Sequence, residues 1–501
     1  MLWNTSLAHA FTNTIFVCLG SAVMATFLGL ILAFLTQCFR VPLSRFMATC
    51  VLGLVLIPVY VQATAWSAGF GVQGWFKLSQ VSAALSPWRA IVSVIWIQGC
   101  AAVPVCFLFC VLGIHRSATA SVRQALLDFG PWRAARCILF PSMVPWIAVC
   151  MLWTIATTGN DMVVTNLFQV PTLTETVYQQ VQFEQVNSAS TLVACSFAIL
   201  IGTILMVGYS LSGAWDRDKR AEASYSFSLA DSQAFRLQGL SRWWGCSLGL
   251  AIVSAVVLLP IGNLIVKAGW VATLADNQIH RSWSPMIVLQ SIARTVTFEE
   301  ELSWSLQLGL YSAVLSLVLA MGLTAFCRWS RWDAVVLGTM GCLLSLPGPM
   351  VNLAVIQLLD RSEPEWVGFL ADRTLCAPIL ALQSRCWPIA FGILWLADQR
   401  FTSENQRQLT FDRVLPLSSR IWIRLRAMMR AMRIAFVVAF FVAFADLASY
   451  LLVQPPQVTT VAMRMFEMLH YGIKNRESGL ALALVLLTIV PTWLLMRKTI
   501  R

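Results

Sequence analysis

Charged residues are scarce in this chain. They make up 12% of its 501 residues, whereas 58% are hydrophobic and the mean hydropathy is +0.73. A soluble globular protein carries roughly 25% charged residues, so this chain has too few to cover a surface that faces water. Histidine is also rare, with four residues, and the fourteen cysteines form no Cys-x-x-Cys pair. Because free cysteine commonly behaves as a small core hydrophobe, we predict no disulfide framework, no metal site and no bound cofactor.

Catalytic patterns are missing as well. The sequence contains no G-x-x-x-x-G-K-[ST] loop to hold the phosphates of a nucleotide, and no pairing of a nucleophile with a base stands out. We therefore predict that the chain is not an enzyme on its own. If ATP powers it, the hydrolysis takes place on another polypeptide.

What the sequence does contain is a series of continuous apolar blocks of the length that crosses a bilayer core, which is about 20 residues. Transmembrane barrel strands would alternate polar and apolar residues, so the blocks indicate helices. The prediction is an all-α integral membrane protein of about eleven spans, of which 374–397 is the least secure because Arg385 interrupts it. The spans lie at about 13–36, 47–70, 90–113, 143–165, 189–211, 246–268, 303–327, 334–359, 374–397, 431–453 and 478–496.

The net charge of +12 comes from Lys and Arg in the short connections between these blocks, a pattern of membrane orientation rather than of nucleic-acid binding. One set of alternate connections holds 24 of the 35 Lys and Arg residues, and the other holds 11. The richer side is predicted to be cytoplasmic, with the N-terminus outside and the C-terminus inside. Residues 1–12 lack a positive region, so the first block is expected to remain as an uncleaved span.

A polar segment, 213–245, divides the chain into two halves, 1–212 with five spans and 246–501 with six. It is predicted to be a cytoplasmic tether. Short matches relate the halves: Ser21-Ala22-Val23 with Ser312-Ala313-Val314, Pro58 with Pro347, and Thr172-Leu173 with Thr460-Val461, at offsets of 291, 289 and 288. Six spans separate each matched pair, so the halves are expected to run in the same direction, as a parallel repeat about the membrane normal. Many ion-driven carriers use inverted repeats instead.

The most informative cytoplasmic segment is 115–142. Its run Gln124-Ala125-Leu126-Leu127-Asp128 reads as a short helix, which Gly130 is suited to end and Pro131 prevents from continuing. Pro141 stands where the next span begins, a position that tolerates proline. The segment is therefore predicted to hold a short helix along the inner surface of the membrane, although an ordinary positive loop would also fit.

This segment resembles the coupling loop of the permease family of binding-protein-dependent ABC importers, which has the pattern Glu-Ala-Ala, three residues, Gly, nine residues, Ile-x-Leu-Pro. The resemblance implies that Gln124, Ala125, Gly130 and Pro141 form the loop that docks on an ATPase subunit. Gln replaces Glu, and the spacing from Gly130 to Pro141 is two residues short. In the second half the corresponding loop, which includes Gln408 and Asp412, departs further from the pattern, with Val414 at the glycine position.

Each span after these loops ends with a carboxylate, Asp161 in the first half and Asp446 in the second, at an offset of 285. A carboxylate at membrane depth normally faces a cavity or a partner. Because the permease family has acidic residues at much this place, the resemblance implies that both line a translocation path, and Pro58 and Pro347 are assigned to the same path. The alternative is that the two carboxylates are interfacial residues wetted from outside.

The segment from Thr459 to Gly472 and the run 173–178 resemble the fused two-half permeases for ferric iron uptake. The expected function is then import of a substrate across the cytoplasmic (inner) membrane, with ATPase subunits and an extracytoplasmic binding protein as partners, in addition to the lipid bilayer. Thiamine, polyamines and phosphonates are alternative substrates. An ion-driven secondary transporter and a membrane scaffold or sensor are alternative functions.

Overall fold

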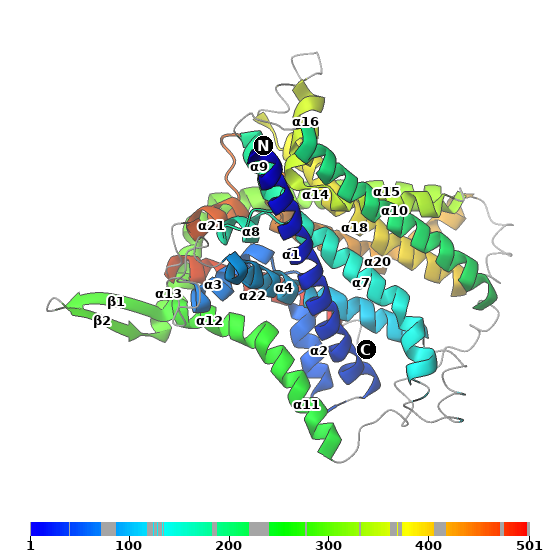
Figure 1. Cartoon of the computed structure of the whole chain (residues 1–501), viewed down its shortest axis with the longest axis horizontal. Coiled ribbons are helices and arrows are strands. Elements are labelled where there is room, and N and C mark those ends of the chain that lie inside the picture. Colours follow the sequence, from blue (N-terminus) through cyan, green and yellow to red (C-terminus); the bar gives the residue numbers. More distant parts are fainter. Residues whose placement is uncertain are drawn as a thin grey trace. The chain divides into compact units, whose positions relative to one another are not determined.

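The computed structural model describes residues 2–39, 41–71, 87–117, 124, 128, 133, 135–182, 188–219, 240–275, 278–329, 332–360, 368, 373–404, 417–470 and 475–497. Almost all of them are helical (Figure 1). The helices of the first half are α1 Leu2–Ala33, α2 Ser44–Gly53, α3 Val59–Phe70, α4 Pro87–Ser117, α7 Phe140–Asn160, α8 Val163–Leu167, α9 Leu173–Gln182 and α10 Ser188–Lys219. Those that follow are α11 Leu240–Val253, α12 Leu259–Gly269, α13 Pro285–Ala293, α14 Glu299–Trp329, α15 Asp333–Ser345, α16 Gly348–Asp360, α18 Cys376–Glu404, α20 Leu417–Ala445, α21 Val461–His470 and α22 Asn475–Arg497.

Short π-helical turns prolong three of these helices: Phe34–Cys38 extends α1, Ala135–Leu139 precedes α7, and Ser254–Leu258 joins α11 to α12. A 3₁₀ turn, Arg294–Phe298, leads into α14. The strands in the described part of the chain are β1 Trp270–Ala275 and β2 Gln278–Trp283, an antiparallel pair in which Trp270 lies opposite Trp283. This hairpin, which the sequence did not predict, extends outward beyond α12 and α13 (Figure 1).

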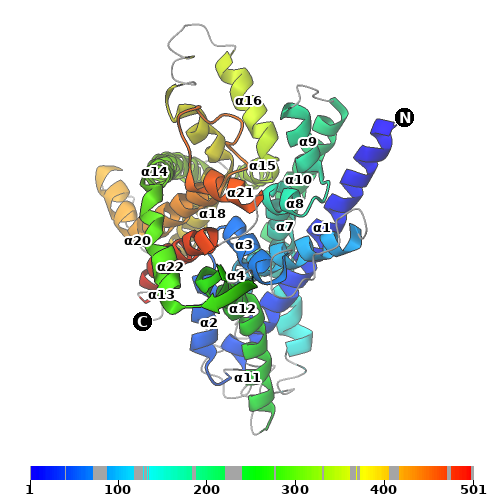
Figure 2. The ribbon, with the colours of Figure 1, turned by 90° about the vertical axis from the view of Figure 1, so that its left-hand side faces the viewer.

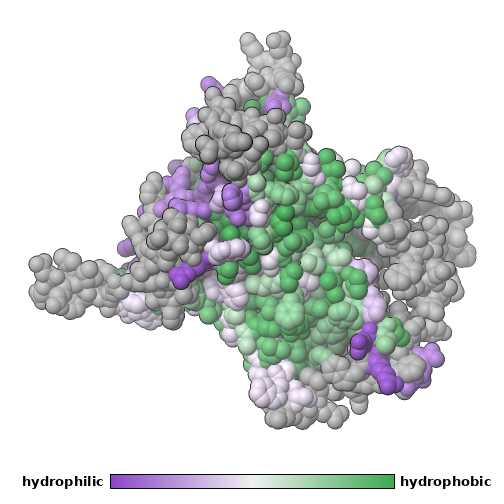
Figure 3. All heavy atoms as spheres, viewed as in Figure 1, coloured by the Kyte–Doolittle hydropathy of each residue, from purple (hydrophilic) through white to green (hydrophobic). Residues whose placement is uncertain are grey.

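The chain is an all-α, multi-pass membrane protein. Within the described residues, seven helices are long and apolar enough to cross a membrane, and a bent pair raises the number to eight. Phe16, Val23 and Phe27 of α1 are 47%, 57% and 61% exposed, an unfavourable arrangement in water that suits lipid. Figure 3 shows apolar side chains covering the face that holds α1 and α7.

Two predicted spans are not continuous helices. The span predicted at 47–70 consists of α2 and α3, separated by a turn that ends at Pro58. The span predicted at 334–359 consists of α15 and α16, which meet at an angle of 100° beside Pro347. The physical reason is the same in both: proline has no N–H for the helix ladder, and its ring clashes with the preceding turn.

The ends of two further spans differ from the prediction. The helix predicted at 143–165 ends at Asn160, and the one predicted at 431–453 runs from Leu417 to Ala445. In both, an aspartate stands directly after the helix and accepts hydrogen bonds from the backbone that follows, which ends the helix there. The sequence stays apolar beyond the aspartate, and for that reason the predicted spans extended too far.

Contacts group the chain into two units: unit 1 is Met1–Thr176, Ser210–Phe298 and Met465–Arg501, and unit 2 is Val177–Tyr209 and Glu299–Arg464. These groups cut across the predicted halves. Within unit 1, α22 of the second half packs on α3 and α12. Within unit 2, α10 of the first half packs on α15, where a Cβ on Gly202 would lie 2.6 Å from the Gly338 carbonyl. Small residues of this kind let helix backbones approach closely in membranes.

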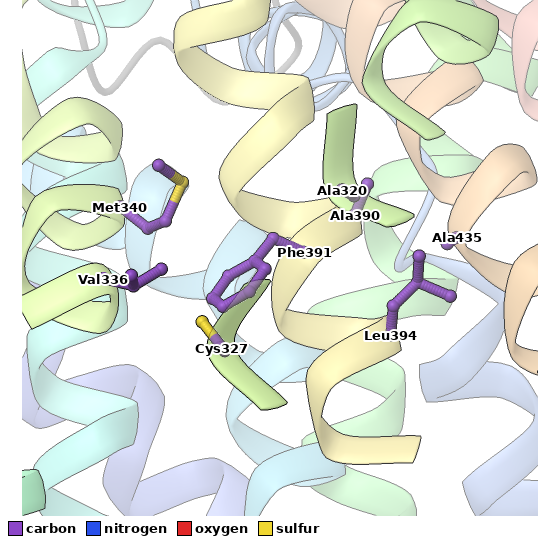
Figure 4. Packing of buried hydrophobic residues seen from close by; sticks show 8 residues of the cluster. All are labelled: Ala320, Cys327, Val336, Met340, Ala390, Phe391, Leu394 and Ala435. Atoms are coloured by element: carbon purple, nitrogen blue, oxygen red, sulfur yellow. The ribbon is translucent and has the colours of Figure 1, made fainter. Parts of the chain in front are cut away.

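Each unit contains a core of three helices that pack against one another. In unit 1, α1, α4 and α7 pack against one another, and in unit 2, α14, α18 and α20 do so. The second set lies side by side in both ribbon views (Figures 1 and 2). Figure 4 shows part of its interior, with Phe391 of α18 among side chains of α14 and α15. The cluster consists of Ala320, Cys327, Val336, Met340, Ala390, Phe391, Leu394 and Ala435.

Candidate functional site: two helix breaks and their polar ties

At each helix break a proline stands directly before the first residue of the next helix, Pro58 before α3 and Pro347 before α16. In each, the proline carbonyl accepts hydrogen bonds from the amides three and four residues later, at 3.1 and 3.3 Å after Pro58 and at 3.0 and 3.2 Å after Pro347. The two sets of atoms are related by the offset of 289 residues that relates the prolines. Both prolines therefore accept the first hydrogen bonds of the helix that follows them.

In unit 2 a buried arginine joins the break to a neighbouring helix. Arg385, in the middle of α18, donates to the carbonyl of Leu346 at 2.9 Å and to that of Leu344. The last four carbonyls of a helix lack partners within the helix, so the break at Pro347 leaves acceptors that the guanidinium can satisfy. Arg385 thus stabilises the broken end of α15 from outside the helix.

The same guanidinium has a carboxylate beside it. Asp446 follows the last residue of α20, and its carboxylate lies 3.7 Å from Nε of Arg385. Ser449 completes the group: its backbone N–H donates to Asp446 at 3.2 Å, its hydroxyl also donates to Asp446, and it accepts from Arg385 at 3.2 Å. The side chains of Arg385 and Asp446 are only 10% and 16% exposed. Because a charge at membrane depth requires a partner, each of the two supplies the partner of the other.

The segment after Asp446 also packs directly on the second break. Nδ2 of Asn352 in α16 donates to the carbonyl of Ala448 at 3.1 Å. A Cβ on Gly348 would lie 2.4 Å from the same carbonyl oxygen, so only glycine fits at that position. The break, the carboxylate and the arginine therefore form one polar tie between α15, α16, α18 and the end of α20.

Unit 1 contains a smaller tie, in which a neutral donor joins the carboxylate that follows α7 to α4. Nε2 of Gln98 in α4 donates to Asp161 at 2.8 Å. Asp161 follows the last residue of α7 and accepts from the backbone N–H groups of Val163 and Val164 at 3.3 and 3.2 Å. Gln98 and Arg385 are 287 residues apart, and Asp161 and Asp446 are 285 apart, which is close to the offset of the prolines.

A polar side chain without a visible partner follows the first break. Gln62, one turn after Pro58, is only 4% exposed, and neither atom of its amide has a hydrogen-bond partner within the described structure. Buried polar atoms are nearly always paired with protein or water, so this position calls for an explanation.

The structure gives the predicted path residues definite local roles. Asp161 and Asp446 each cap a turn and tie two helices together, while Pro58 and Pro347 each stand at a helix break. That these four line a translocation path stays a prediction.

The predicted coupling residues are described only in part. Gln124 is helical and exposed, as is Asp128 one turn later, and Pro141 is the second residue of α7, where proline is tolerated. Four of the assigned positions lie outside the described residues: Ala125, Gly130, Gln408 and Asp412.

Sequence reasoning missed the donors of both ties. Arg385 was noted only because it weakens a span, and Gln98 was not noted at all. The offset between the halves could have revealed them, because Gln98 and Arg385 are polar residues at nearly corresponding positions of two mainly apolar helices. Among the described residues, no group of three or more His, Cys, Asp or Glu side chains is arranged to hold a metal ion.

The chain matches no protein-family model and no curated protein.

Proposed function

We propose that the chain is the membrane-spanning permease subunit of an importer in which separate ATPase subunits supply the energy. Substrate would be delivered by an extracytoplasmic binding protein at the cytoplasmic (inner) membrane, and ferric iron is the leading substrate, with thiamine, polyamines and phosphonates as alternatives. About eleven spans in two like-oriented bundles of five and six form the proposed architecture.

The observation that carries this proposal is the repeated set of elements. Each copy has a three-helix core, a helix pair broken at a proline, and a polar tie between the third span and the end of the fourth. A broken helix pair supplies backbone polar groups at membrane depth, which lipid does not tolerate but a solute pathway requires. Two such breaks fit a solute route better than they fit an inert scaffold.

Gln62 supports the same interpretation. A buried amide without a partner beside the first break is explained if water or solute reaches it in another conformation of the protein. ATP binding on the partner subunits would then bias an equilibrium between conformations of the permease, as in other switching transitions.

An ion-driven carrier is the second candidate, and one observation favours it. The Arg385–Asp446 pair joins a cation in the middle of one apolar helix to a carboxylate directly after another, and ionisable pairs of this kind are a feature of proton and ion relays. The predicted parallel repeat favours the permease. Uptake into vesicles that depends on an ion gradient, with no ATP and no ATPase present, would support the carrier.

The test uses the predicted coupling loop. The full chain is co-expressed with candidate ABC ATPase subunits, and ATPase co-purification is measured for the wild type and for a variant that lacks residues 125–133. The matched control lacks nine residues of the predicted linker, 225–233. We expect the first deletion to abolish co-purification while membrane insertion persists, and the control deletion to leave it intact. Association that survives loss of 125–133 contradicts the coupling assignment.

A further inference from the structure

A groove of about 440 Å³ lies on unit 2 between the first part of α14 and the start of α18, and its walls are mostly apolar. α14 contributes four residues that are three or four positions apart and therefore share one face of the helix: Trp304, Gln307, Tyr311 and Leu315. The opposite wall comes from the start of α18 and includes Ile379. Pockets that hold small ligands in other proteins measure roughly 300–1,000 Å³, so one ligand fits here.

The groove opens toward lipid. Both of the helices that line it belong to segments that are long and apolar enough to cross a membrane. Beside the groove on α14, Leu310, Val314 and Val318 are 45%, 48% and 60% exposed, an arrangement that suits hydrocarbon rather than water. The groove is therefore continuous with the surface that α14 presents to the bilayer.

The groove is about as deep as one leaflet. The first turn of α14 contains Glu299, Glu300 and Glu301, and it lies in the headgroup layer because charges are costly in hydrocarbon. Trp304 follows one turn later, at the interfacial depth where tryptophan is enriched. From Trp304 to Leu315 the helix rises about 17 Å, and half of the hydrocarbon core is about 15 Å thick. The groove thus extends from the headgroups to the middle of the bilayer, as an acyl chain does.

The width of the groove also fits a single chain. Its volume spread over a length of about 17 Å gives a width of roughly 5 Å, whereas a helix with its side chains is about 10–12 Å wide. A helix of a partner protein would therefore not enter it. A hydrocarbon chain, which is the solvent at this depth, does.

The headgroup end of the groove has a negative side and a positive side. Glu300 is exposed and stands one turn before Trp304 on the same face of α14. Across the groove, Thr374 lines the wall where α18 begins, and its hydroxyl accepts from the backbone N–H of Cys376 at 3.2 Å. The N-terminus of a helix carries a partial positive charge that favours phosphate. The two sides together match a headgroup that has both an amine and a phosphate.

We propose that the groove holds one acyl chain of a zwitterionic phospholipid, with the headgroup between Glu300 and the start of α18. Burial of the chain's methylene groups supplies the affinity, and the charges at the headgroup end select the lipid. Lipid binding here does not depend on the proposed transport function, whereas the leaflet, the outer one, follows from the predicted orientation.

Native mass spectrometry of the full chain tests the headgroup. The protein in detergent is incubated with phosphatidylethanolamine or phosphatidylglycerol that have the same acyl chains, and bound lipid is counted. We expect the wild type to prefer phosphatidylethanolamine and Glu300→Gln to reduce that preference about fivefold. Glu299→Gln removes the same charge from a neighbouring face of the helix and should leave the preference unchanged. Equal effects of the two changes, or a wild type without preference, would overturn the proposal.

Filling the groove tests the chain. Ile379→Trp should reduce the bound phosphatidylethanolamine about tenfold. Leu310→Trp places the same side chain on the exposed surface beside the groove and should leave the lipid count unchanged. An unchanged count in Ile379→Trp would contradict the proposal. If that variant instead loses association with a second copy of the chain on size-exclusion chromatography, the groove is a protein interface and the proposal is wrong.

A measurement on the unaltered protein decides the matter if Ile379→Trp does not fold. Cys376 lines the groove and is partly exposed, and Cys50 of unit 1 is partly exposed as well. Added phosphatidylethanolamine should slow the reaction of Cys376 with N-ethylmaleimide about fivefold and leave that of Cys50 unchanged, as measured by peptide mass spectrometry. Equal slowing at both cysteines, or slowing at neither, would overturn the proposal.

Discussion

Replacing Arg385 with methionine tests the second polar tie most sharply. The change keeps an unbranched apolar stem of similar length but lacks the guanidinium group. It therefore removes the donors to the carbonyls of Leu344 and Leu346 and to the Ser449 hydroxyl, and it leaves Asp446 without its cation. Breaking a buried ion pair by removing one partner typically destabilises a protein by about 3–5 kcal/mol. We expect a loss near the lower value, because Asp446 keeps its bonds from Ser449.

Thermal unfolding of the purified protein in detergent is the assay. For a unit of this size, 1 kcal/mol corresponds to about 2–4 °C, so Arg385→Met should lower the midpoint by roughly 10 °C. Arg385→Gln recreates the neutral donor that Gln98 provides in the first half and should lower it by less than half as much. The exposed Arg426→Met serves as a matched control and should change it by no more than about 1 °C.

A double-mutant cycle then separates the tie from simple packing. Asp446→Asn in the Arg385→Met background should be less destabilising than in the wild type, with a coupling of at least about 1 kcal/mol. A midpoint for Arg385→Met that stays close to the wild type, or strictly additive effects of the two changes, would refute the reasoning.

Three further changes test the packing around the breaks and between helices. Gly348→Ala brings a methyl group against the Ala448 carbonyl and should destabilise the folded protein by about 1–3 kcal/mol in thermal unfolding. Its control, Gly392→Ala, has open space around the added methyl group and should be neutral or slightly stabilising in the same assay. Gly202→Val should lower the yield of folded protein on size-exclusion chromatography, because its side chain meets a backbone carbonyl of α15. Ser305→Ala removes the 2.8 Å acceptor for the first amide of α21 and should cost about 1 kcal/mol; an unchanged midpoint would show that water replaces it.

The helical class of the fold follows from the sequence because lipid leaves few choices. A continuous apolar block such as 90–113 must satisfy its backbone internally, and α4 covers that block completely. Block length carries no information about breaks, however, so 47–70 was taken as one helix although Pro58 stood within it. Proline in a membrane helix is often tolerated, and the outcome depends on whether neighbouring groups satisfy the freed carbonyls.

Long-range packing was beyond the reach of the sequence. The sequence of α22 does not indicate that it packs on α3, and the sequence of α10 does not indicate that it packs on α15. In lipid, any helix face with small residues can serve as an interface. The site was predictable in part: the aspartates and prolines stand out in apolar surroundings, whereas their donors Gln98 and Arg385 become meaningful only once the helices are placed.

The central claim is that the two halves are copies of one bundle with the same orientation in the membrane. Single cysteines at Gln124, Leu425 and Gln290, in a background depleted of the native cysteines, can be labelled with a maleimide that does not cross the membrane. All three positions are exposed. Labelling of Gln124→Cys and Leu425→Cys from the cytoplasmic side alone, and of Gln290→Cys from the outside alone, is the predicted result. Labelling of Gln124→Cys and Leu425→Cys from opposite sides would show an inverted repeat and contradict the account.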